Sequence, residues 1–368
     1  MRRFALLVLL ALLPAWHHTP ALAEETAKKT TVLLTHPRKR ELRNIAGLVQ
    51  HGLLKVPGLR LVGIHHAQEY EDYDDSREYV EGEAPDWIEL ESISCELSKD
   101  KLFGKNGCTP VFEKLFAESA AVILTGGPDI QPRLYGLKTR LTTKIEDPNR
   151  HLFEISFLAH LVGGGRAQNN EALLASRPEY VILGLCLGMQ SLNVASGGTL
   201  IQDIPSMIYG IRTFEDGQKL PRAKKHRSFL APLDPAPGVG WAAIHPVRFV
   251  RKSQITRTLL PEGRVVNVVS LHHQAVGRLG KGLEVLATSL DGKVVEALVH
   301  RKYPAVIGVQ FHPERSILWD AEHEYRKSPG AGEHNYVAAW FAGDDKARAF
   351  HEAFWKMISQ WISKSASR

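Results

Sequence analysis

The chain has 368 residues, of which 44% are apolar and 23% charged, so it can bury a substantial core as one large domain or two small ones. The formal net charge of +6 is spread along the chain without a basic stripe interleaved with aromatic residues, which argues against a nucleic-acid partner. After the first residues, no stretch is apolar enough to predict a membrane helix.

The first residues have the pattern of a secretion signal. A basic start precedes the apolar run Phe4 to Leu13, which is too short to span a bilayer, and Ala21-Leu22-Ala23 is a small-residue cleavage site. We therefore expect residues 1–23 to be a signal peptide and residues 24–368 to be a periplasmic or secreted protein without membrane contact. An uncleaved buried helix is the alternative.

The mature chain begins with alternating strands and helices. Strands are predicted at Thr31 to Thr35 and at Leu59 to Ile64, with a helix from Pro37 to Leu54 between them, which indicates a parallel sheet covered by helices. An acidic stretch, Glu69 to Glu91, interrupts this rhythm within an expected insertion near residues 68–110. We expect a solvated surface insertion there, with a selectivity flap over the site as the alternative.

Three cysteines suit an oxidising compartment. Cys95 and Cys108 are near neighbours in a loop-like region and could pair, which would leave Cys186 as the free thiol. Two unpaired thiols fit the residues equally well.

A glycine-rich strand end is predicted in the segment that precedes Cys186. A helix is expected over Val111 to Ser119 and a strand over Ala121 to Leu124, followed by Gly126 and Gly127. Glycines directly after a strand let a backbone NH approach a ligand. A further helix is predicted from Asp147 to Leu161.

The most informative stretch surrounds Cys186. The apolar run Tyr180 to Leu183 predicts a buried strand, the sequence G-L-C-L-G follows, and helix-forming residues continue to Ala195. Strand, sharp turn and helix form the pattern of a nucleophile elbow, with Cys in place of Ser. The helix N-terminus favours a Cys186 thiolate, and the NH of Leu187 is free to help form an oxyanion hole. A core cysteine in a Gly-flanked turn is the alternative.

The second half of the chain predicts a loop, several strands and a final helix. Ser206 to Gly240 is rich in Pro, Gly and charge and is expected to be loop, Asp291-Gly292 indicates a hairpin, and the apolar spacing from Ala347 to Trp361 indicates a helix. The predicted strands are Val247 to Val250, Val265 to Ser270, Leu283 to Ser289, Val294 to Val299 and Ala305 to Phe311.

The last strand runs into His312 and Glu314. Residues two apart in an extended backbone point to the same side, so Glu314 can fix the tautomer of the His312 ring. His312 and Cys186 both follow strands, at the sheet edge where open α/β folds hold their sites. Together the three residues predict a nucleophile, its base and an orienting carboxylate.

These motifs resemble a known family. The stretches L-G-L-C-L-G-M-Q and G-V-Q-F-H-P-E are similar to the class I glutamine amidotransferase superfamily, also called peptidase C26. G-G-P-D-I-Q-P-R-L-Y-G, G-G-T-L-I-Q-D-I, S-L-H-H-Q-A-V and D-G-K-V-V-E-A resemble its γ-glutamyl-γ-aminobutyrate hydrolase branch. The resemblance covers about Thr31 to Ser316.

The resemblance implies a flavodoxin-like α/β fold, with a mostly parallel central sheet, helices on both faces and a small antiparallel region, as a single domain over residues 24–368. The implied site comprises a catalytic triad of Cys186, His312 and Glu314, an oxyanion hole at Gly127 and Leu187, and substrate-binding residues Gln190, Ser270 and His272. No metal or cofactor is expected.

The chain departs from this branch at three places. Leu187 stands where the branch has Arg, Val269 where it has Asn, and Arg150-His151 where it has Arg-Asp. These changes spare the triad but leave the specificity for the leaving group open.

We expect an exported hydrolase that cleaves a small γ-glutamyl amide through a γ-glutamyl thioester on Cys186. A folate-type γ-glutamyl hydrolase, a glutaminase subunit that feeds ammonia to a synthetase, and a non-catalytic binding protein of the same fold are the alternatives. The sequence leaves a homodimer open.

Overall fold

The computed structural model describes residues 29–165, 171–233, 242–260, 263–319, 324–325, 334–335 and 344–367. The predicted signal peptide, residues 1–23, and part of the predicted loop up to Gly240 lie outside the described residues. Within the described ranges, no helix combines the length and the apolar character needed to cross a membrane.

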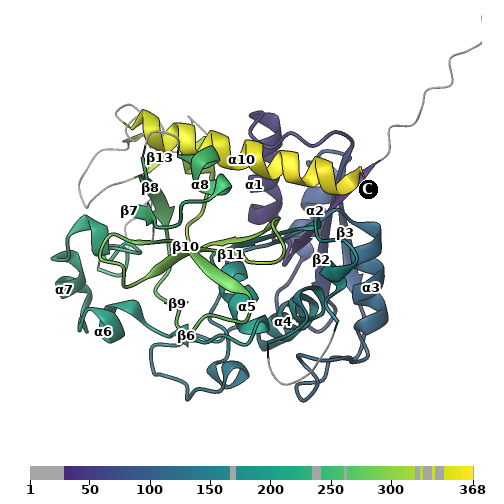
Figure 1. Cartoon of the computed structure of the whole chain (residues 1–368), viewed down its shortest axis with the longest axis horizontal. Coiled ribbons are helices and arrows are strands. Elements are labelled where there is room, and N and C mark those ends of the chain that lie inside the picture. Colours follow the sequence, from purple (N-terminus) through teal and green to yellow (C-terminus); the bar gives the residue numbers. More distant parts are fainter. Residues whose placement is uncertain are drawn as a thin grey trace, which may run out of the picture.

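One ten-stranded sheet forms the centre of the molecule (Figure 1). Its parallel half consists, in spatial order, of β3 (Ile88–Ile93), β2 (Leu59–His66), β1 (Thr30–Thr35), β4 (Ala121–Leu124), β5 (Val181–Leu185) and β12 (Val306–Val309). The central strands β4, β5 and β12 are buried along their whole length, as expected for strands covered on both faces.

The same sheet continues as an antiparallel half. Its strands are β11 (Val295–His300), β10 (Leu283–Ser289), β7 (Ala243–Phe249) and β8 (Val265–Ser270). The turn between β10 and β11 contains Gly292 at φ +73°, so the hairpin predicted at Asp291-Gly292 is confirmed. Two small sheets pair β6 (Leu200–Ile201) with β9 (Ala275–Val276) and β13 (Glu324–Tyr325) with β14 (His334–Asn335).

Helices cover both faces of the sheet (Figure 1). One face carries α1 (Lys39–Gln50), α8 (Gln254–Leu259) and α10 (Asp345–Ala366), and the other carries α3 (Thr109–Glu118), α4 (Pro148–Val162) and α5 (Leu187–Ala195). Each face has its own apolar core, because alternate side chains of the strands point to opposite sides. The predicted fold class, a mostly parallel sheet with helices on both faces and an antiparallel region, is confirmed.

The sequence predicted that the acidic segment lies outside the strand–helix architecture, but in the structure it is part of it. It supplies α2 (Asp74–Gly82) and the edge strand β3, which pairs in parallel with β2 and so continues the alternation. The acidic composition concealed this strand, because a strand at the edge of a sheet is partly exposed and needs few apolar residues. Ile88 and Ile93 are buried, while most of the acidic side chains between Glu69 and Glu91 remain partly or fully exposed.

The segment expected to be loop after Ser206 also contains short helices. These are α6 (Ile204–Ile208), α7 (Phe214–Gln218) and a 3₁₀ turn at Arg222–Lys224. The Asp203 side chain accepts from the Ser206 NH and caps α6, and Thr213 caps α7 in the same way. Capping side chains thus stabilise short helices in a stretch whose composition predicts a loop. Further 3₁₀ turns lie at Pro132–Tyr135, Leu173–Ala175 and Ser316–Leu318.

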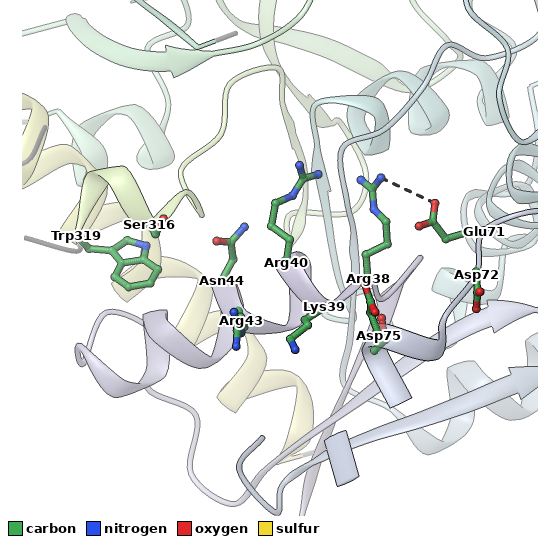
Figure 2. Close-up of a pocket in the computed structure, with 11 residues that line it drawn as sticks. Arg38, Lys39, Arg40, Arg43, Asn44, Glu71, Asp72, Asp75, Ser316 and Trp319 are labelled. Atoms are coloured by element: carbon green, nitrogen blue, oxygen red, sulfur yellow. Dashed lines mark ion pairs between the residues drawn. The ribbon is translucent and has the colours of Figure 1, made fainter. Parts of the chain in front are cut away.

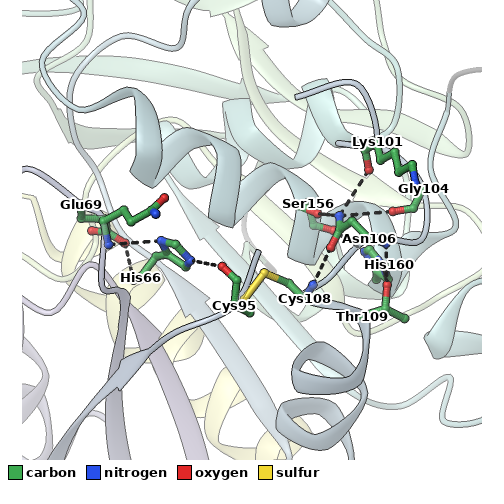
Figure 3. The surroundings of a disulfide bond; sticks show 11 residues. His66, Glu69, Cys95, Lys101, Gly104, Asn106, Cys108, Thr109, Ser156 and His160 are labelled. Carbon is green, nitrogen blue, oxygen red and sulfur yellow. Dashed lines mark hydrogen bonds between the residues drawn. A yellow bond between two sulfur atoms is a disulfide. The ribbon is translucent and has the colours of Figure 1, made fainter. Parts of the chain in front are cut away.

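Cys95 and Cys108 form a disulfide, which the sequence had left open (Figure 3). His66 Nε2 lies 2.9 Å from the Cys95 carbonyl oxygen, and the Cys108 NH donates to Asn106 Oδ1 at 2.9 Å. The bond ties the chain after β3 to the start of α3. Of the described cysteines, Cys186 alone is a free thiol.

Candidate active site

Cys186 occupies the sharp turn between β5 and α5 in a strained backbone conformation. Its φ is +52° and its ψ is −102°, which costs a non-Gly residue of order 1–3 kcal/mol. A Cβ on Gly184 would lie 2.6 Å from the backbone of Gly188, and a Cβ on Gly188 would lie 2.4 Å from the Leu124 carbonyl oxygen. Both glycines are therefore needed for close packing, and the elbow holds the thiol at the edge of the sheet.

The His312 ring lies beside this thiol. Gly126 is the neighbour that they share: a Cβ added there would lie 2.9 Å from His312 Cε1 and 3.6 Å from Cys186 Cβ. On its other side the ring is held by Glu314, whose Oε1 is 2.6 Å from His312 Nδ1. The structure thus brings Cys186, His312 and Glu314 together in the order that the sequence predicts.

The electrostatics of the three groups favour a charged imidazole. Burial lowers the pKa of His312, but the charges of Glu314 and the Cys186 thiolate, with hydrogen bonds to both, raise it to about 9. Burial opposes ionisation of Glu314, yet the charge and hydrogen bond of His312 bring its pKa below the usual value. At neutral pH this arrangement favours a His312 imidazolium beside the Glu314 carboxylate.

Two backbone NH groups near this centre, those of Gly127 and Leu187, come from different elements. Leu187 is the first residue of α5, so its NH has no acceptor within the helix, and Gly127 follows β4. Neither NH donates a hydrogen bond to another residue in the described part of the chain. A Cβ added to Gly127 would lie 2.9 Å from Leu187 Cδ2, so the Leu187 side chain packs against the glycine loop.

A buried ion pair lies behind the glycine loop. Arg150 is fully buried, pairs with Glu154 at 3.1 Å, and donates from Nη2 to the carbonyl oxygens of Thr125 and Gly126, each at 3.1 Å. Glu154 also accepts from Thr35 Oγ1 at 2.7 Å. The sequence had singled out Arg150 only as half of an altered Arg-Asp pair. Its position shows that it holds the loop that carries Gly127.

The thiol opens into a cavity of about 600 Å³. Besides Cys186, His312 and Glu314, its charged lining consists of Arg38, Arg40, Glu41, Asp129, Lys144, Glu146, Asp203, Arg227, His273 and Arg315. Both signs of charge are present, which suits a substrate that carries an ammonium and a carboxylate group.

Gln190, expected to hold substrate, is not among the described residues that line this cavity. Its Nε2 donates to Gln310 Oε1 at 3.2 Å and to the Gln274 carbonyl oxygen at 3.3 Å. Gln310 in turn donates to Cys186 Sγ at 3.6 Å. Gln190 therefore reaches the thiol through Gln310, a residue of the G-V-Q-F-H-P-E stretch for which the sequence predicted no role.

Ser270 and His272 are likewise absent from the described cavity lining, and their neighbours Leu271 and His273 line it instead. Neighbouring side chains at and just after the end of β8 thus point to different sides, and a role of Ser270 and His272 in substrate binding stays a prediction. Ser270 and His272 point into a buried cluster with His226, His245 and Glu296.

His273 bridges two acidic residues of the cavity. Its Nε2 lies 3.0 Å from Asp129 and its Nδ1 3.2 Å from Asp203. Burial alone would lower the pKa of His273, but hydrogen bonds to both carboxylates raise it. Asp129, Asp203 and His273 come from three separate motif stretches, so each motif was visible in the sequence but their convergence was not.

A second cavity, of about 630 Å³, adjoins the first (Figure 2). Arg38 and Arg40 line both cavities, and they extend in the same direction from the start of α1. Lys39 and Arg43 add two more positive charges, opposite Glu71 and other acidic residues. The active-site cavity therefore continues into a surface groove with a basic wall.

The sequence matches the peptidase C26 family over residues 108–314, more than half of the chain. The chain belongs to this family. It is 33% identical to the glutamine amidotransferase-like protein YvdE of Lactococcus lactis over 56% of this chain and 70% of that protein. It is 30% identical to the γ-glutamyl-γ-aminobutyrate hydrolase PuuD of Escherichia coli over 55% of this chain and 67% of that protein.

Among solved structures, a glutamine amidotransferase from Thermotoga maritima aligns with 83% of this chain and 95% of its own, at 14% identity and a TM-score of 0.35. The family that the sequence motifs predicted is therefore confirmed by the family match and the curated relatives. The matched range begins at Cys108 and ends at Glu314, so it contains all three residues of the Cys-His-Glu arrangement.

Proposed function

We propose that this peptidase C26 protein is an exported cysteine hydrolase that cleaves γ-glutamyl amide bonds. The convergence of a strained Cys186, the His312–Glu314 pair and the Gly127 loop on one cavity carries the proposal, and the unused NH of Leu187, next to Cys186, supports it. A binding protein would not need a strained cysteine at the edge of a cavity, paired with an imidazolium.

The chemistry follows from these positions. The Cys186 thiolate attacks the δ-carbonyl carbon, and the carbonyl oxygen becomes an oxyanion between the NH groups of Gly127 and Leu187. The His312 imidazolium donates its proton to the departing amine as the C–N bond breaks, which leaves a γ-glutamyl thioester. Neutral His312 then takes a proton from water, which attacks the thioester and releases glutamate and the thiolate.

The cavity charges support recognition of the glutamyl head group. Asp129 and Asp203 supply carboxylates for an α-ammonium group, and Arg227 supplies a guanidinium for an α-carboxylate. The relative PuuD is named as a hydrolase of γ-glutamyl-γ-aminobutyrate, a compound with such a head group.

The test is a hydrolysis screen over a panel of γ-glutamyl amides, with Cys186→Ala as the control. We expect release of glutamate from at least one compound and a loss of several orders of magnitude in Cys186→Ala. An electrophilic glutamine analogue should label Cys186 rapidly at neutral pH, in proportion to lost activity. Hydrolysis undiminished in Cys186→Ala contradicts the mechanism, and absence of both hydrolysis and labelling favours a binding protein. Glutaminase activity that appears only with a co-purifying partner favours the amidotransferase subunit.

Export is supported by the amino-terminal pattern and by the Cys95–Cys108 disulfide, since such bonds persist mainly outside the cytosol. Amino-terminal sequencing of the exported protein should start at Glu24. A chain that starts at Met1 and stays in the cytoplasm would rule out this part of the proposal.

A second candidate, hydrolysis of γ-linked oligoglutamates, is favoured by the basic wall beside the active site. Arg38 and Arg40 line both the active-site cavity and the adjoining groove, so they would attract the further carboxylates of a chain that extends from one into the other. We expect Arg40→Gln to raise KM for an anionic leaving group such as glutamate, with KM for an uncharged amine unchanged. Equal effects on both substrates would count against a carboxylate in this groove.

A further inference from the structure

A second cluster of reactive side chains lies outside the active-site cavity. His226, His245, His272 and Glu296 are each at most 3% exposed, and one ligand atom from each lies within 4.8 Å of the others. They come from the loop after the Arg222–Lys224 turn, from β7, from the end of β8 and from β11. Because the four residues are far apart in the chain, no ligand spacing is visible in the sequence, from which we expected no metal.

The backbone is shaped to bring Glu296 into this cluster. Ala297 pairs with Ala287 and Val295 with Thr288, so Glu296 is an extra residue in β11 at an irregularity of the β10–β11 ladder. Such bulges re-aim a side chain and are common beside active sites. The side chain of Glu296 is fully buried, and neither of its oxygens accepts a well-formed hydrogen bond from another described residue. A buried carboxylate is costly unless its charge is balanced, here either by a protonated imidazole such as His226 or by a cation bound between the four side chains.

The imidazoles are prepared as ligands. His272 Nδ1 lies 2.9 Å from the Gln274 carbonyl oxygen, to which it donates, so the lone pair of Nε2 faces the cluster and has no hydrogen-bond partner among the described residues. This pairing of a histidine with a backbone carbonyl is the usual outer-shell support of a metal ligand. His226 Nδ1 also faces Glu296.

The ligand atoms lie close enough together for small side-chain movements to place them around one transition-metal ion. His226 Nδ1 lies 3.0 Å from Glu296 Oε1, and the Nε2 atoms of His245 and His272 each lie 3.7 Å from a Glu296 oxygen. A tetrahedral zinc ion with bonds of about 2.0–2.2 Å holds its ligand atoms about 3.3–3.6 Å apart. We propose that His226, His245, His272 and Glu296 form a closed structural zinc site.

A second candidate metal cluster in the described residues, which contains sulfur, is excluded by its chemistry. His66 lies near Cys95 and Cys108, but both sulfur atoms are used in the disulfide. Three imidazoles and one carboxylate, with no thiolate, also suit zinc better than a soft ion such as Cu(I).

The zinc site would support the wall of the active site. His226 and His272 directly precede Arg227 and His273 in the chain, and both of those residues line the catalytic cavity. The carbonyl oxygen of Glu296 accepts from the Gln310 NH at 2.8 Å, and Gln310 contacts the Cys186 sulfur. The metal would therefore fix substrate-binding residues without touching substrate, and the inference does not depend on which substrate is cleaved.

The test measures metal binding directly. Tag-free Cys186→Ala protein is used throughout, so that the catalytic thiol cannot bind zinc. We expect one zinc ion per chain by mass spectrometry of the metal content. After chelation the melting temperature should fall by several degrees and recover with added zinc chloride, since a ligand of the folded state raises apparent stability. Cobalt chloride should give the visible spectrum of a tetrahedral ion.

Glu296→Gln and His245→Gln, added to Cys186→Ala, should weaken zinc binding by more than the roughly 10–100-fold of a typical outer-shell change. His300→Gln, on the same strand as Glu296 but outside the cluster, serves as the matched control and should bind zinc normally. The proposal is overturned if Cys186→Ala protein binds no zinc in a calorimetric titration, or if Glu296→Gln and His300→Gln bind it equally well. Hydrolysis by the wild-type protein is scored separately, so either proposal can fail alone.

Discussion

At the scale of single residues, the candidate site depends on a few backbone and charge constraints. Cys186 adopts a positive φ, and Gly184 and Gly188 make room for it. The His312–Glu314 contact of 2.6 Å sets the charge of the ring. Changes at Cys186, His312 or Glu314 should therefore alter the chemistry more than the fold, whereas a side chain at Gly184 or Gly188 would disturb the packing of the elbow.

We expect Glu314→Gln to shift the alkaline limit of activity toward neutral pH. Activity needs the charged imidazole as an acid, so in the wild type kcat/KM should fall as pH rises through the His312 pKa of about 9. The glutamine removes the negative charge that raises this pKa, so the fall should begin at lower pH. A pH profile of kcat/KM for both proteins checks this. An unchanged alkaline limb would show that Glu314 does not control the pKa of His312.

We expect Gly127→Ala to lower kcat by about 100-fold or more, the usual effect of losing one oxyanion donor. The new Cβ would lie 2.1 Å from Arg150 Nη1, so either the loop or the buried guanidinium must move. Gly82→Ala is the control, because nothing lies within 4 Å of its added Cβ. Steady-state kinetics and thermal melts of both variants make the comparison. Wild-type kcat in Gly127→Ala would remove this NH from the oxyanion hole.

At the scale of elements, the carboxyl-terminal helix supports the catalytic strand end. Phe350 and Phe354 of α10 lie in the apolar core that covers one face of the sheet. From the same helix, Trp355 Nε1 donates to the Pro313 carbonyl oxygen at 3.0 Å. Pro313 stands between His312 and Glu314, so α10 fixes the backbone that carries the base and its orienting carboxylate.

We expect Trp355→Phe to destabilise the protein by about 1–2 kcal/mol, because the buried Pro313 carbonyl loses its donor. The variant should also lower kcat, since the strand end gains freedom. Trp361→Phe is the matched control on the same helix, at a partly exposed position. Denaturant unfolding and kinetics should separate the two. Equal effects of the two substitutions would show that the Trp355 hydrogen bond does not position His312 and Glu314.

At the scale of the whole molecule, the active site lies where the parallel half of the sheet meets the antiparallel half. Strand β12 pairs in parallel with β5, which leads to Cys186, and antiparallel with β11, which carries Glu296. The disulfide closes a different region, near the outer edge strand β3. Stability and catalysis should therefore respond separately to changes in these two regions.

We expect replacement of both Cys95 and Cys108 by serine to lower the free energy of unfolding by about 3 kcal/mol, because the bond closes a loop of 13 residues' separation. Labelling of Cys186 by the glutamine analogue should continue at the wild-type rate under native conditions. Denaturant unfolding and labelling kinetics check the two halves of the prediction. Loss of labelling in a protein that remains folded would connect the disulfide to the site.

The sequence by itself determined the central strands, the elbow at Cys186 and the H-P-E strand end, because strand–turn–helix patterns and neighbouring residues are local. It did not show that Leu271 and His273, rather than Ser270 and His272, line the cavity, since a shift of one residue reverses the direction of a side chain. Only the tertiary structure decided that His273 joins Asp129 and Asp203, that Arg150 holds the glycine loop, and that three histidines meet Glu296. These groups come from separate elements, and the packing of the sheet and its loops, which no local pattern encodes, brings them together.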